Sequence, residues 1–489
     1  MNIALTTQET LGLMKESLAK NVTISTGLTA YDLQAPAKNL YPTLTPLRNS
    51  VPRVARLNPG DAARWRAIYS VTGSGFDAMG WIPEGQRSAS MSYQAVLNVA
   101  PYMTLGEEDT VTFEAEAAAQ GFEDVNATAT LRILQKTMRK EETALLGGNT
   151  SLQLGKPGNP TLSASGTGGT LPAATYSVIV VGLTFEGYRN SSLSGGVATT
   201  KTITGNDGNT YTLNGGSSLR SNNVTQAVAA GQTLFATAPV VNGAVAYAWY
   251  VGTAGSETLQ AITTINSAAF NTPLTTGQQA ATVITADNSS NQLAFDGLLT
   301  VGFNPVNSAY VQALASGTAG TGTFLTPSGR GSINEIDNML MQMWNAYRLS
   351  PTVIYVNAQE QKNITAKCLT NASGPLVRYN VEASQSAPYE FTASGVVRWY
   401  YNPFTGVEIP MPVHPDLPPG TILAFCERLP VWYQSNEVPN IAEVLTRRDY
   451  YRVDWPIHTR RREFGVYTEE VLAVYAPFGV GILTNIGNG

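Results

Sequence analysis

Cysteine and histidine are scarce in this 489-residue chain, which contains only two residues of each type. Cys368 and Cys426 lack the spacing of a zinc site, and two cysteines do not make a disulfide framework in a chain of this size. His414 and His458 have no second histidine or cysteine at a ligand spacing. We therefore predict two buried free thiols, no metal site and no other cofactor.

Charged residues are also few, at 13% of the chain, and the formal net charge is -5. This composition argues against sequence-specific nucleic-acid binding, which needs a basic surface. No run of eighteen apolar residues occurs, and residues 1–20 lack a basic segment followed by an apolar one. We therefore expect a soluble protein of a reducing compartment, without a transmembrane helix or a secretory signal.

Motifs of catalysis are missing as well. The chain has no GxSxG elbow, no HExxH helix and no EF-hand loop, and Gly155-Lys156 is followed by proline without the spacing of a phosphate-binding loop. Adjacent acids such as Glu107-Glu108 and Glu469-Glu470 do not face each other on a helix or a strand. We expect these acids to be solvated or to lie in an interface, and we predict that the protein is not an enzyme.

The stretch from Phe113 to Leu146 has the pattern of one long helix whose charges are sorted along its axis. Acidic residues fill its first half and basic residues its second half, which complements the helix dipole. At about 1.5 Å per residue it would run roughly 50 Å, and Gly121 is a place where it could kink or split. We expect its narrow apolar stripe to pack on the later segment 466–475.

An arm and a long hairpin are predicted before this helix. Prolines keep much of residues 1–52 extended after a short amphipathic segment at 7–21. Residues 64–71 and 88–99 alternate between apolar and polar side chains, as two strands do, around a glycine-rich tip. A two-stranded hairpin is marginally stable alone, so its apolar side chains must rest on something.

Residues 156–294 differ in composition from the rest of the chain. Only eight of the 30 basic and 35 acidic residues fall there, and short β-runs appear at 176–183, 209–213 and 246–251. We predict a small β-sandwich inserted into the chain, which resembles immunoglobulin-like or fibronectin-type-III-like modules. A low-complexity linker is the alternative, but Trp249, Tyr247, Phe235 and Ile179 favour a packed core.

The segment after this insert alternates helices and strands. Ser332 to Glu335 has a capping-box pattern before a helix, 352–356 reads as a buried strand, and 357–369 as another helix. Residues 443–486 combine strand-forming apolar residues with two groups of arginines. We expect this last segment to return as a sheet under the long helix.

The order of arm, glycine-tipped hairpin, polarised helix, α/β segment and returning sheet resembles tailed-phage major capsid proteins of the HK97-like fold. The stretches 407–421, with its run His414-Pro415-Asp416-Leu417-Pro418-Pro419, and 467–479 carry the likeness further. The resemblance implies an α+β fold with six parts. These are the N-terminal arm (1–52), the E-loop hairpin (53–105), the peripheral domain with its spine helix (106–155), the inserted β-sandwich (156–294), the axial domain (295–440) and the returning peripheral sheet (441–489).

The same resemblance implies self-assembly into hexamers and pentamers of an icosahedral shell that encloses a double-stranded DNA genome, contacted non-specifically. The protein would then be a virion component assembled in the host cytoplasm, with portal, scaffolding and decoration proteins as partners and no membrane contact. Ten side chains become candidates for contacts between subunits. They are Arg64, Arg66, Trp81, Glu84 and Arg87 on the hairpin, and Arg447, Arg448, Arg460, Arg461 and Arg462 in the returning sheet.

Two features depart from that family or extend it. Some members crosslink a lysine of the hairpin to a neighbour's asparagine, but no lysine lies between Lys38 and Lys136. We therefore expect a shell without covalent crosslinks, and we expect the neutral, polar insert to project from its outer surface. The alternative from another class is a secreted or surface adhesin or carbohydrate-binding protein built around the insert.

Overall fold

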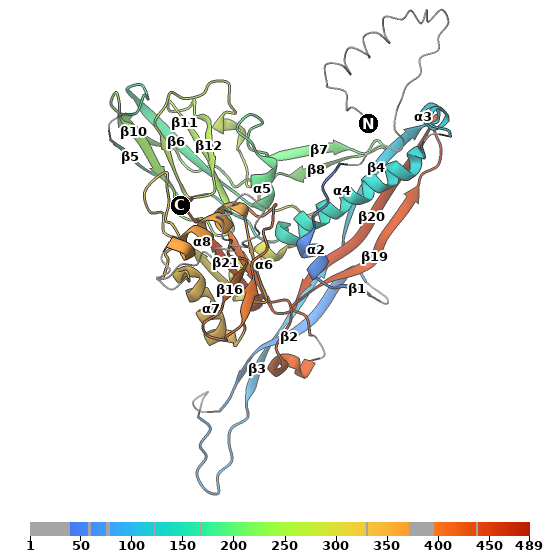
Figure 1. Cartoon of the computed structure of the whole chain (residues 1–489), viewed down its shortest axis with the longest axis vertical. Helices are drawn as coiled ribbons and strands as arrows, with labels where there is room; N and C mark the ends of the chain where they lie inside the picture. Colours follow the sequence, from blue (N-terminus) through green and yellow to red (C-terminus); the bar gives the residue numbers. More distant parts are fainter. Residues whose placement is uncertain are drawn as a thin grey trace, which may run out of the picture.

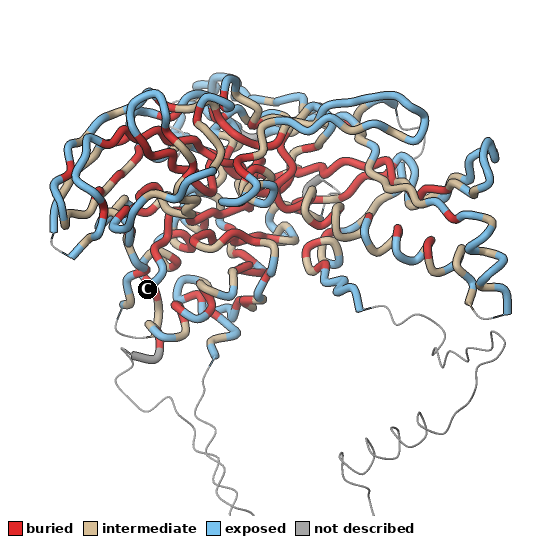
Figure 2. Tube along the Cα trace, turned by 90° about the horizontal axis from the view of Figure 1, so that it is seen from above, coloured by how far each residue is buried: buried red, intermediate tan, exposed pale blue. Residues whose placement is uncertain are grey.

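The computed structural model describes residues 40–56, 60–74, 79–121, 123–166, 168–328, 331–370, 396–436 and 439–489. The predicted helical segment 7–21 and most of the arm lie outside these ranges. The described part mixes helices with sheets that are mostly antiparallel. Buried residues fill the centre of the molecule, whereas its projecting segments are pale blue in Figure 2, which marks them as exposed.

The predicted long helix is two helices. Thr112 caps α3 (Phe113–Ala118) by accepting a hydrogen bond from the Ala115 amide, and Asp124 caps α4 (Val125–Gly147) by accepting one from the Ala127 amide at 3.0 Å. Gly121 lies between them with a φ of +80°, which an L side chain rarely adopts. The long helix predicted from Phe113 to Leu146 is therefore split at Gly121, where the sequence allowed a break, and α4 alone spans about 35 Å at about 1.5 Å per residue.

Helix α4 lies on a four-stranded sheet with the order β1-β19-β20-β4 (Figure 1). The strands are β1 (Arg53–Ala55), β19 (Ala442–Asp454), β20 (Arg461–Val474) and β4 (Met103–Thr112). Ala129 and Ile133 of α4 pack with Val111, Phe464 and Val466 of the sheet in one small cluster. The predicted packing on 466–475 is thus confirmed at Val466, while strand β4, which the sequence did not indicate, adds a second surface.

A long two-stranded hairpin leaves this sheet and projects away from the body (Figure 1). It consists of β2 (Ala62–Thr72) and β3 (Ser92–Pro101), close to the predicted ranges 64–71 and 88–99. A short helix, α2 (Pro46–Ser50), precedes β1 in the described part of the arm.

The described residues between 296 and 436, with β21 from the C-terminal end, form a second body around a sheet of order β14-β21-β18-β15. Its strands are β14 (Tyr310–Ala313), β21 (Val480–Thr484), β18 (Ile422–Phe425) and β15 (Val353–Val356), and it carries the ribbon β16 (Trp399–Tyr401) with β17 (Glu408–Pro410). Its helices are α6 (Leu298–Phe303), α7 (Asn334–Tyr347) and α8 (Ala358–Thr370), with short 3-10 turns at Pro305–Asn307, Val431–Asn436 and Pro477–Gly479. The strand predicted at 352–356, the helix predicted after Ser332 and the helix predicted at 357–369 are confirmed.

Two details of this body differ from the predictions. Strand β21 does not join the sheet under α4; it pairs with β18 and β14, so the chain end crosses between the two bodies. The capping box at Ser332 is also absent, because the Ser332 hydroxyl bonds to Ser328 and the Glu335 carboxylate accepts from the Thr326 amide at 2.9 Å.

The insert contains two sheets that share one hydrophobic cluster. One sheet has the order β13-β10-β5 and the other β12-β11-β6-β9, and Trp249 lies fully buried in the cluster between them. The strands are β5 (Thr161–Ser165), β6 (Ala174–Leu183), β9 (Val224–Val228), β10 (Thr233–Thr237), β11 (Ala246–Gly252), β12 (Thr258–Thr263) and β13 (Ser267–Phe270). A helix α5 (Phe185–Asn190), a 3-10 turn (Ala281–Val283) and the ribbon β7 (Thr200–Thr204) with β8 (Thr210–Asn214) complete it. The packed core rules out a low-complexity linker.

The insert is joined closely to the rest of the molecule. Phe185 and Val245 lie in the same buried cluster as Leu145 and Leu146 of α4. Ribbon β7–β8 reaches over the sheet under α4, where the Asn206 amide donates to the Glu108 carboxylate at 2.8 Å. Because the insert and the body share a core, they form one continuous structure.

Candidate assembly interface and the buried junction behind it

The register of hairpin β2–β3 decides which side chains share a face. Arg66 lies directly opposite Leu97, and Ile68 lies opposite Ala95. The register shifts between Ile68 and Ser70, so that Val71 pairs with Tyr93 farther out. One face of the hairpin therefore carries an apolar row with arginines near its base.

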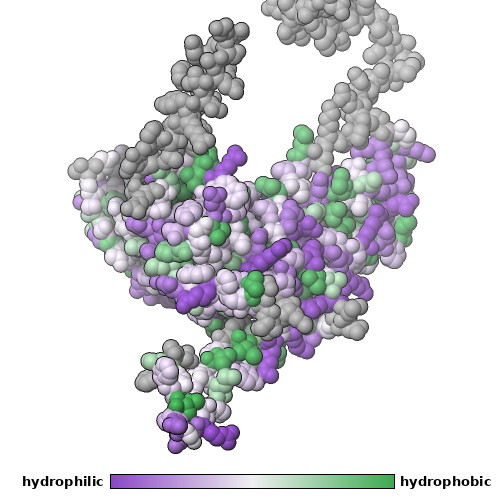
Figure 3. Space-filling view, turned by 60° about the horizontal axis from the view of Figure 1, so that its bottom comes forward, coloured by the Kyte–Doolittle hydropathy of each residue, from purple (hydrophilic) through white to green (hydrophobic). Residues whose placement is uncertain are grey.

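This row has no cover from the described residues of the same chain. Leu97 is 64% exposed and Ile68 is 59% exposed, although both are large aliphatic side chains. Figure 3 brings the hairpin forward and shows green apolar surface along it beside purple polar surface. We call the following residues the hairpin patch. They are Ile68, Val71, Met91, Tyr93, Leu97 and Val99.

The base of the hairpin, in contrast, is fixed to the body. Ala63 is buried in the main cluster, and the Trp65 ring packs edge-on against Tyr475 with 5.5 Å between ring centroids. The hairpin patch is thus held away from the body by a packed base. Contiguous apolar surface of this kind on a projecting element marks an interaction site.

The predicted hairpin residues all lie on exposed surface. Arg64 forms an exposed ion pair with Asp61 at 3.2 Å, and Arg66 is exposed without an ion pair to a described carboxylate. Trp81 is 90% exposed near the tip, where Glu84 and Arg87 are exposed too.

The predicted arginines of the returning sheet are engaged within their own chain. Arg460 and Arg462 pair with Glu114 and Glu116 of α3 at 2.5 and 3.0 Å. Three others complete the set: Arg447 pairs with Glu469, Arg461 with Glu463, and the Arg448 guanidinium lies over the Tyr451 ring. The pairs of Arg460 and Arg462 are exposed and contribute little to stability, whereas the carboxylates of Glu469 and Glu463 keep only 12% and 17% of their side chains exposed.

Behind the hairpin, a buried network joins the arm, α4, the sheet and the second body. We call it the junction, and sequence reasoning did not find it. Its members are Arg48, Arg53, Glu141, Glu142, His414, Asp449, Tyr450 and Glu470. The signal was two adjacent acids at 141–142 within the apolar stripe of α4, where core side chains are expected.

Glu142 is the acceptor at the centre of the junction. Its carboxylate accepts the backbone amides of Leu47 at 2.9 Å and Arg48 at 2.7 Å, which are in the first turn of α2. It also accepts a hydrogen bond from His414 Nε2 at 2.7 Å, and His414 Nδ1 in turn accepts one from the Asp416 backbone amide at 3.2 Å. The imidazole therefore carries its proton on Nε2, and one carboxylate ties together three segments far apart in the chain.

Glu141 and Glu470 share Arg53. Its guanidinium bonds to Glu141 and lies 2.9 Å from a Glu470 oxygen, and both carboxylates are fully buried. The pKa of Glu470 is raised to about 7, because burial and then the neighbouring Glu141 carboxylate raise it more than Arg53 lowers it. The other Glu470 oxygen, Oε1, has no hydrogen-bond partner in the described structure. The expectation that the pair Glu469-Glu470 is solvated or lies in an interface was thus wrong for Glu470.

His414 therefore serves as a structural donor in this structure. Among the described residues, no group of three or more His, Cys, Asp or Glu side chains could hold a metal ion.

Cys368 and Cys426 are buried and free, as predicted. In the same described part, no helix has both the length and the apolar character needed to cross a membrane.

Comparisons with known proteins find similarity only at the level of structure. No protein-family model matches the chain, and no curated protein matches it in sequence. Solved structures of capsid and encapsulin chains are among the structural matches. One is the cyanophage A-1(L) capsid, at 10% identity and a TM-score of 0.45 over 96% of this chain and 99% of that one.

Two further matches come from other kinds of particle. The capsid of the native GTA particle matches at 9% identity and a TM-score of 0.43, over 96% of this chain and 100% of that one. The encapsulin complex of Synechococcus elongatus PCC 7942 matches at 10% identity and a TM-score of 0.37, over 93% of each chain.

Proposed function

We propose that this chain is the major capsid protein of a tailed phage, a subunit that assembles into hexamers and pentamers of an icosahedral shell around double-stranded DNA. It would be a virion component assembled in the host cytoplasm. Portal, scaffolding and decoration proteins are its proposed partners, and DNA would be contacted without sequence preference, in keeping with the net charge of -5.

The observation that carries this proposal is the uncovered hairpin patch. Its residues project on a fixed base, and the described part of the same chain does not cover them. A second copy of the chain is always present at the same concentration as the first and carries the same surfaces. Head-to-tail contacts repeated from copy to copy form a ring when the rotation between neighbours closes. Arg64, Arg66, Trp81, Glu84 and Arg87 surround the patch and would supply polar contacts to the neighbouring subunit.

The five arginines of the returning sheet are proposed as a second contact surface. Arg460 and Arg462 lie beside α3, at the end of the sheet farthest from the hairpin base. Their intrachain partners are exposed acids, so a neighbouring carboxylate could exchange with them at small cost. Such rim charges contribute specificity more than affinity.

Electron microscopy of the purified full-length chain tests the function directly. We expect closed shells some hundreds of ångströms wide, and sedimentation should show hexamers or pentamers before closure. The measurement should be repeated with a crowding agent, which replaces part of the concentrating effect of a scaffolding protein. A chain that remains monomeric under every one of these conditions would overturn the proposal.

The insert is proposed to face outward from the shell, and labelling of assembled particles tests this. Both native cysteines are buried, so a single exposed cysteine introduced by Lys201→Cys on β7 is the reactive thiol. A membrane-impermeant maleimide of large size should label intact shells to the same extent as dissociated subunits. Labelling only after dissociation would place the insert inside.

A further inference from the structure

A polar pocket of about 480 Å³ lies in the insert, where Ile179 of β6 meets the segment 219–223 before β9 and the segment 255–257 before β12. Its size is within the range of pockets that bind small molecules. Three of the eight charged residues of the insert line it, and these are Lys156, Arg220 and Glu257. Such a concentration of charge in an otherwise neutral domain calls for a physical account.

Glu257 has its hydrogen bonds within the protein. Its side chain is buried at 4% exposure, where it accepts the Ser177 hydroxyl at 2.5 Å and the Gly255 amide at 3.2 Å. Lys156 is engaged too, because its ammonium donates to Asn222 Oδ1 at 2.6 Å. These bonds hold two of the charged groups in fixed places on the pocket wall.

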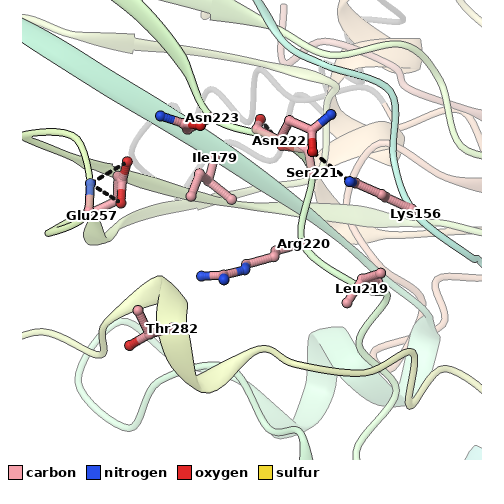
Figure 4. Close-up of a pocket in the computed structure, with 10 residues that line it drawn as sticks. Lys156, Ile179, Leu219, Arg220, Ser221, Asn222, Asn223, Glu257 and Thr282 are labelled. Atoms are coloured by element: carbon pink, nitrogen blue, oxygen red, sulfur yellow. Dashed lines mark hydrogen bonds between the residues drawn. The ribbon is translucent and has the colours of Figure 1, made fainter.

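Arg220 is the charged group that remains available. Figure 4 shows its side chain extended into the space between Glu257 and Thr282, with no dashed line to any residue drawn. No carboxylate of the described residues lies within ion-pair distance of its guanidinium. A guanidinium placed in this way offers a planar fork of donors that matches a carboxylate.

The other residues that line the pocket determine which chemical groups can accompany the carboxylate in a ligand. The amides of Asn222 and Asn223 and the hydroxyl of Thr282 can both donate and accept, as sugar hydroxyls require. Ile179 and Leu219 supply a small apolar surface for a carbon skeleton. The Glu257 carboxylate disfavours a dianion such as phosphate through like-charge repulsion.

From this lining we infer that the insert carries a binding site for a small hydroxylated monocarboxylate of the hexuronate class, with Arg220 as its anchor. The site belongs to one subunit and does not depend on the proposed shell. It can therefore be tested on unassembled protein, and its failure leaves the proposed function untouched.

The experiment is isothermal titration calorimetry of the full-length chain with D-glucuronate as the probe. We expect saturable binding near the weak end of specific affinities, at a Kd of about 1 mM or tighter. D-glucose, which lacks the carboxylate, and inorganic phosphate, titrated at about pH 8 where it is mainly a dianion, should each bind at least about tenfold more weakly.

Variants show whether Arg220 is responsible. Arg220→Met should weaken glucuronate binding at least about tenfold, the low end of what a hydrogen bond to a charged group contributes. Lys201→Met removes a cation of the same insert that lies outside the pocket, and it should bind as the wild type does. Circular dichroism checks that both variants are folded.

Three results would overturn the inference. The first is that no saturable binding is seen even at glucuronate concentrations well above about 1 mM. The second is equal affinity for glucose and glucuronate, and the third is an unchanged affinity of the folded Arg220→Met variant for glucuronate. Phosphate binding more tightly than glucuronate would contradict the monocarboxylate class in particular.

To separate a free hexuronate from a residue within a polysaccharide, the same titration is run with alginate. Competition between alginate and glucuronate shows that polymer-bound uronates enter the site, whereas binding of the monosaccharide alone assigns the site to free acids. Both results support the proposed ligand chemistry.

Discussion

Glu142 in α4 and His414 in the second body are joined by a 2.7 Å hydrogen bond, and both side chains are completely buried. They are 272 positions apart in sequence. The same carboxylate holds the first turn of α2, so the arm, the long helix and the second body meet at one side chain. Substitution of this carboxylate should therefore lower the stability of the arm, α4 and the second body together.

Glu142→Ala should lower the free energy of unfolding of the unassembled subunit by about 3 kcal/mol or more. It leaves the Leu47 and Arg48 amides and the imidazole without their acceptor, and each buried unsatisfied group costs about 1–3 kcal/mol. Urea denaturation measures this, with Glu142→Gln, which keeps one acceptor oxygen, expected to lose less. Glu114→Ala is the control, because its ion pair with Arg460 is exposed and contributes at most about 1 kcal/mol. Equal losses for Glu142→Ala and this control would contradict the role of the junction.

Glu470 should make subunit stability fall as the pH rises from about 5 to about 7. Its pKa is raised from an ordinary value of 4.5 to about 7, so the folded state binds more protons than the unfolded state between these values. Unfolding then becomes easier as the pH rises through this window. The melting temperature of Glu470→Gln, compared with the wild type at several pH values, should show a shallower fall. Parallel curves for the two proteins would show that Glu470 does not titrate there.

Leu97→Asp should prevent shell assembly while leaving the monomer folded. Leu97 is already exposed in the subunit, so its replacement changes folding stability by no more than about 0.5 kcal/mol. A charge in an interface that buries the hairpin patch would be desolvated at considerable cost. Analytical ultracentrifugation should find monomers. Gln94→Glu, a charge added at an exposed polar position of the same strand, is the matched control and should still assemble.

Arg66→Glu should also block assembly, through repulsion in place of a proposed ion pair with a neighbouring subunit. Arg66 has no ion pair with a described carboxylate of its own chain, so circular dichroism and thermal unfolding of the monomer should be unchanged. Lys201→Glu reverses a charge on the insert and controls for the change in net charge. Particles of normal yield and size from Arg66→Glu would defeat this assignment.

Purified particles should dissociate into single chains on denaturing gels. The hairpin offers no lysine for an isopeptide bond, since none lies between Lys38 and Lys136. Shell stability would then depend on non-covalent contacts, and high salt should weaken the share carried by exposed charges. A ladder of covalent multimers would show that another pair of side chains reacts.

Local patterns in the sequence indicated most of the elements. Alternation located the hairpin strands, Gly121 marked the break between α3 and α4, and charge depletion marked the insert. These signals are local, because strand periodicity, a positive φ and composition are each set by residues near one another in the chain. The sequence did not show which side chains of the two strands share a face of the hairpin, because a bulge between Ile68 and Ser70 shifts the alternation.

What the sequence determined by itself was thus the order and type of the elements, including the long apolar hairpin on which the proposed function rests. That the described part of the chain leaves this hairpin uncovered was visible only in the tertiary structure. Only the tertiary structure decided which buried charges meet. The sequence suggested that Glu470 is a solvated acid beside Glu469, yet its carboxylate is buried against Arg53 of β1. Glu142 likewise bonds to His414, which lies 272 positions later in the chain. The same holds for Arg220, whose open position follows from where the insert strands place Glu257 and Thr282. Pairings between distant segments depend on the packing of whole sheets and helices, and no local pattern records them.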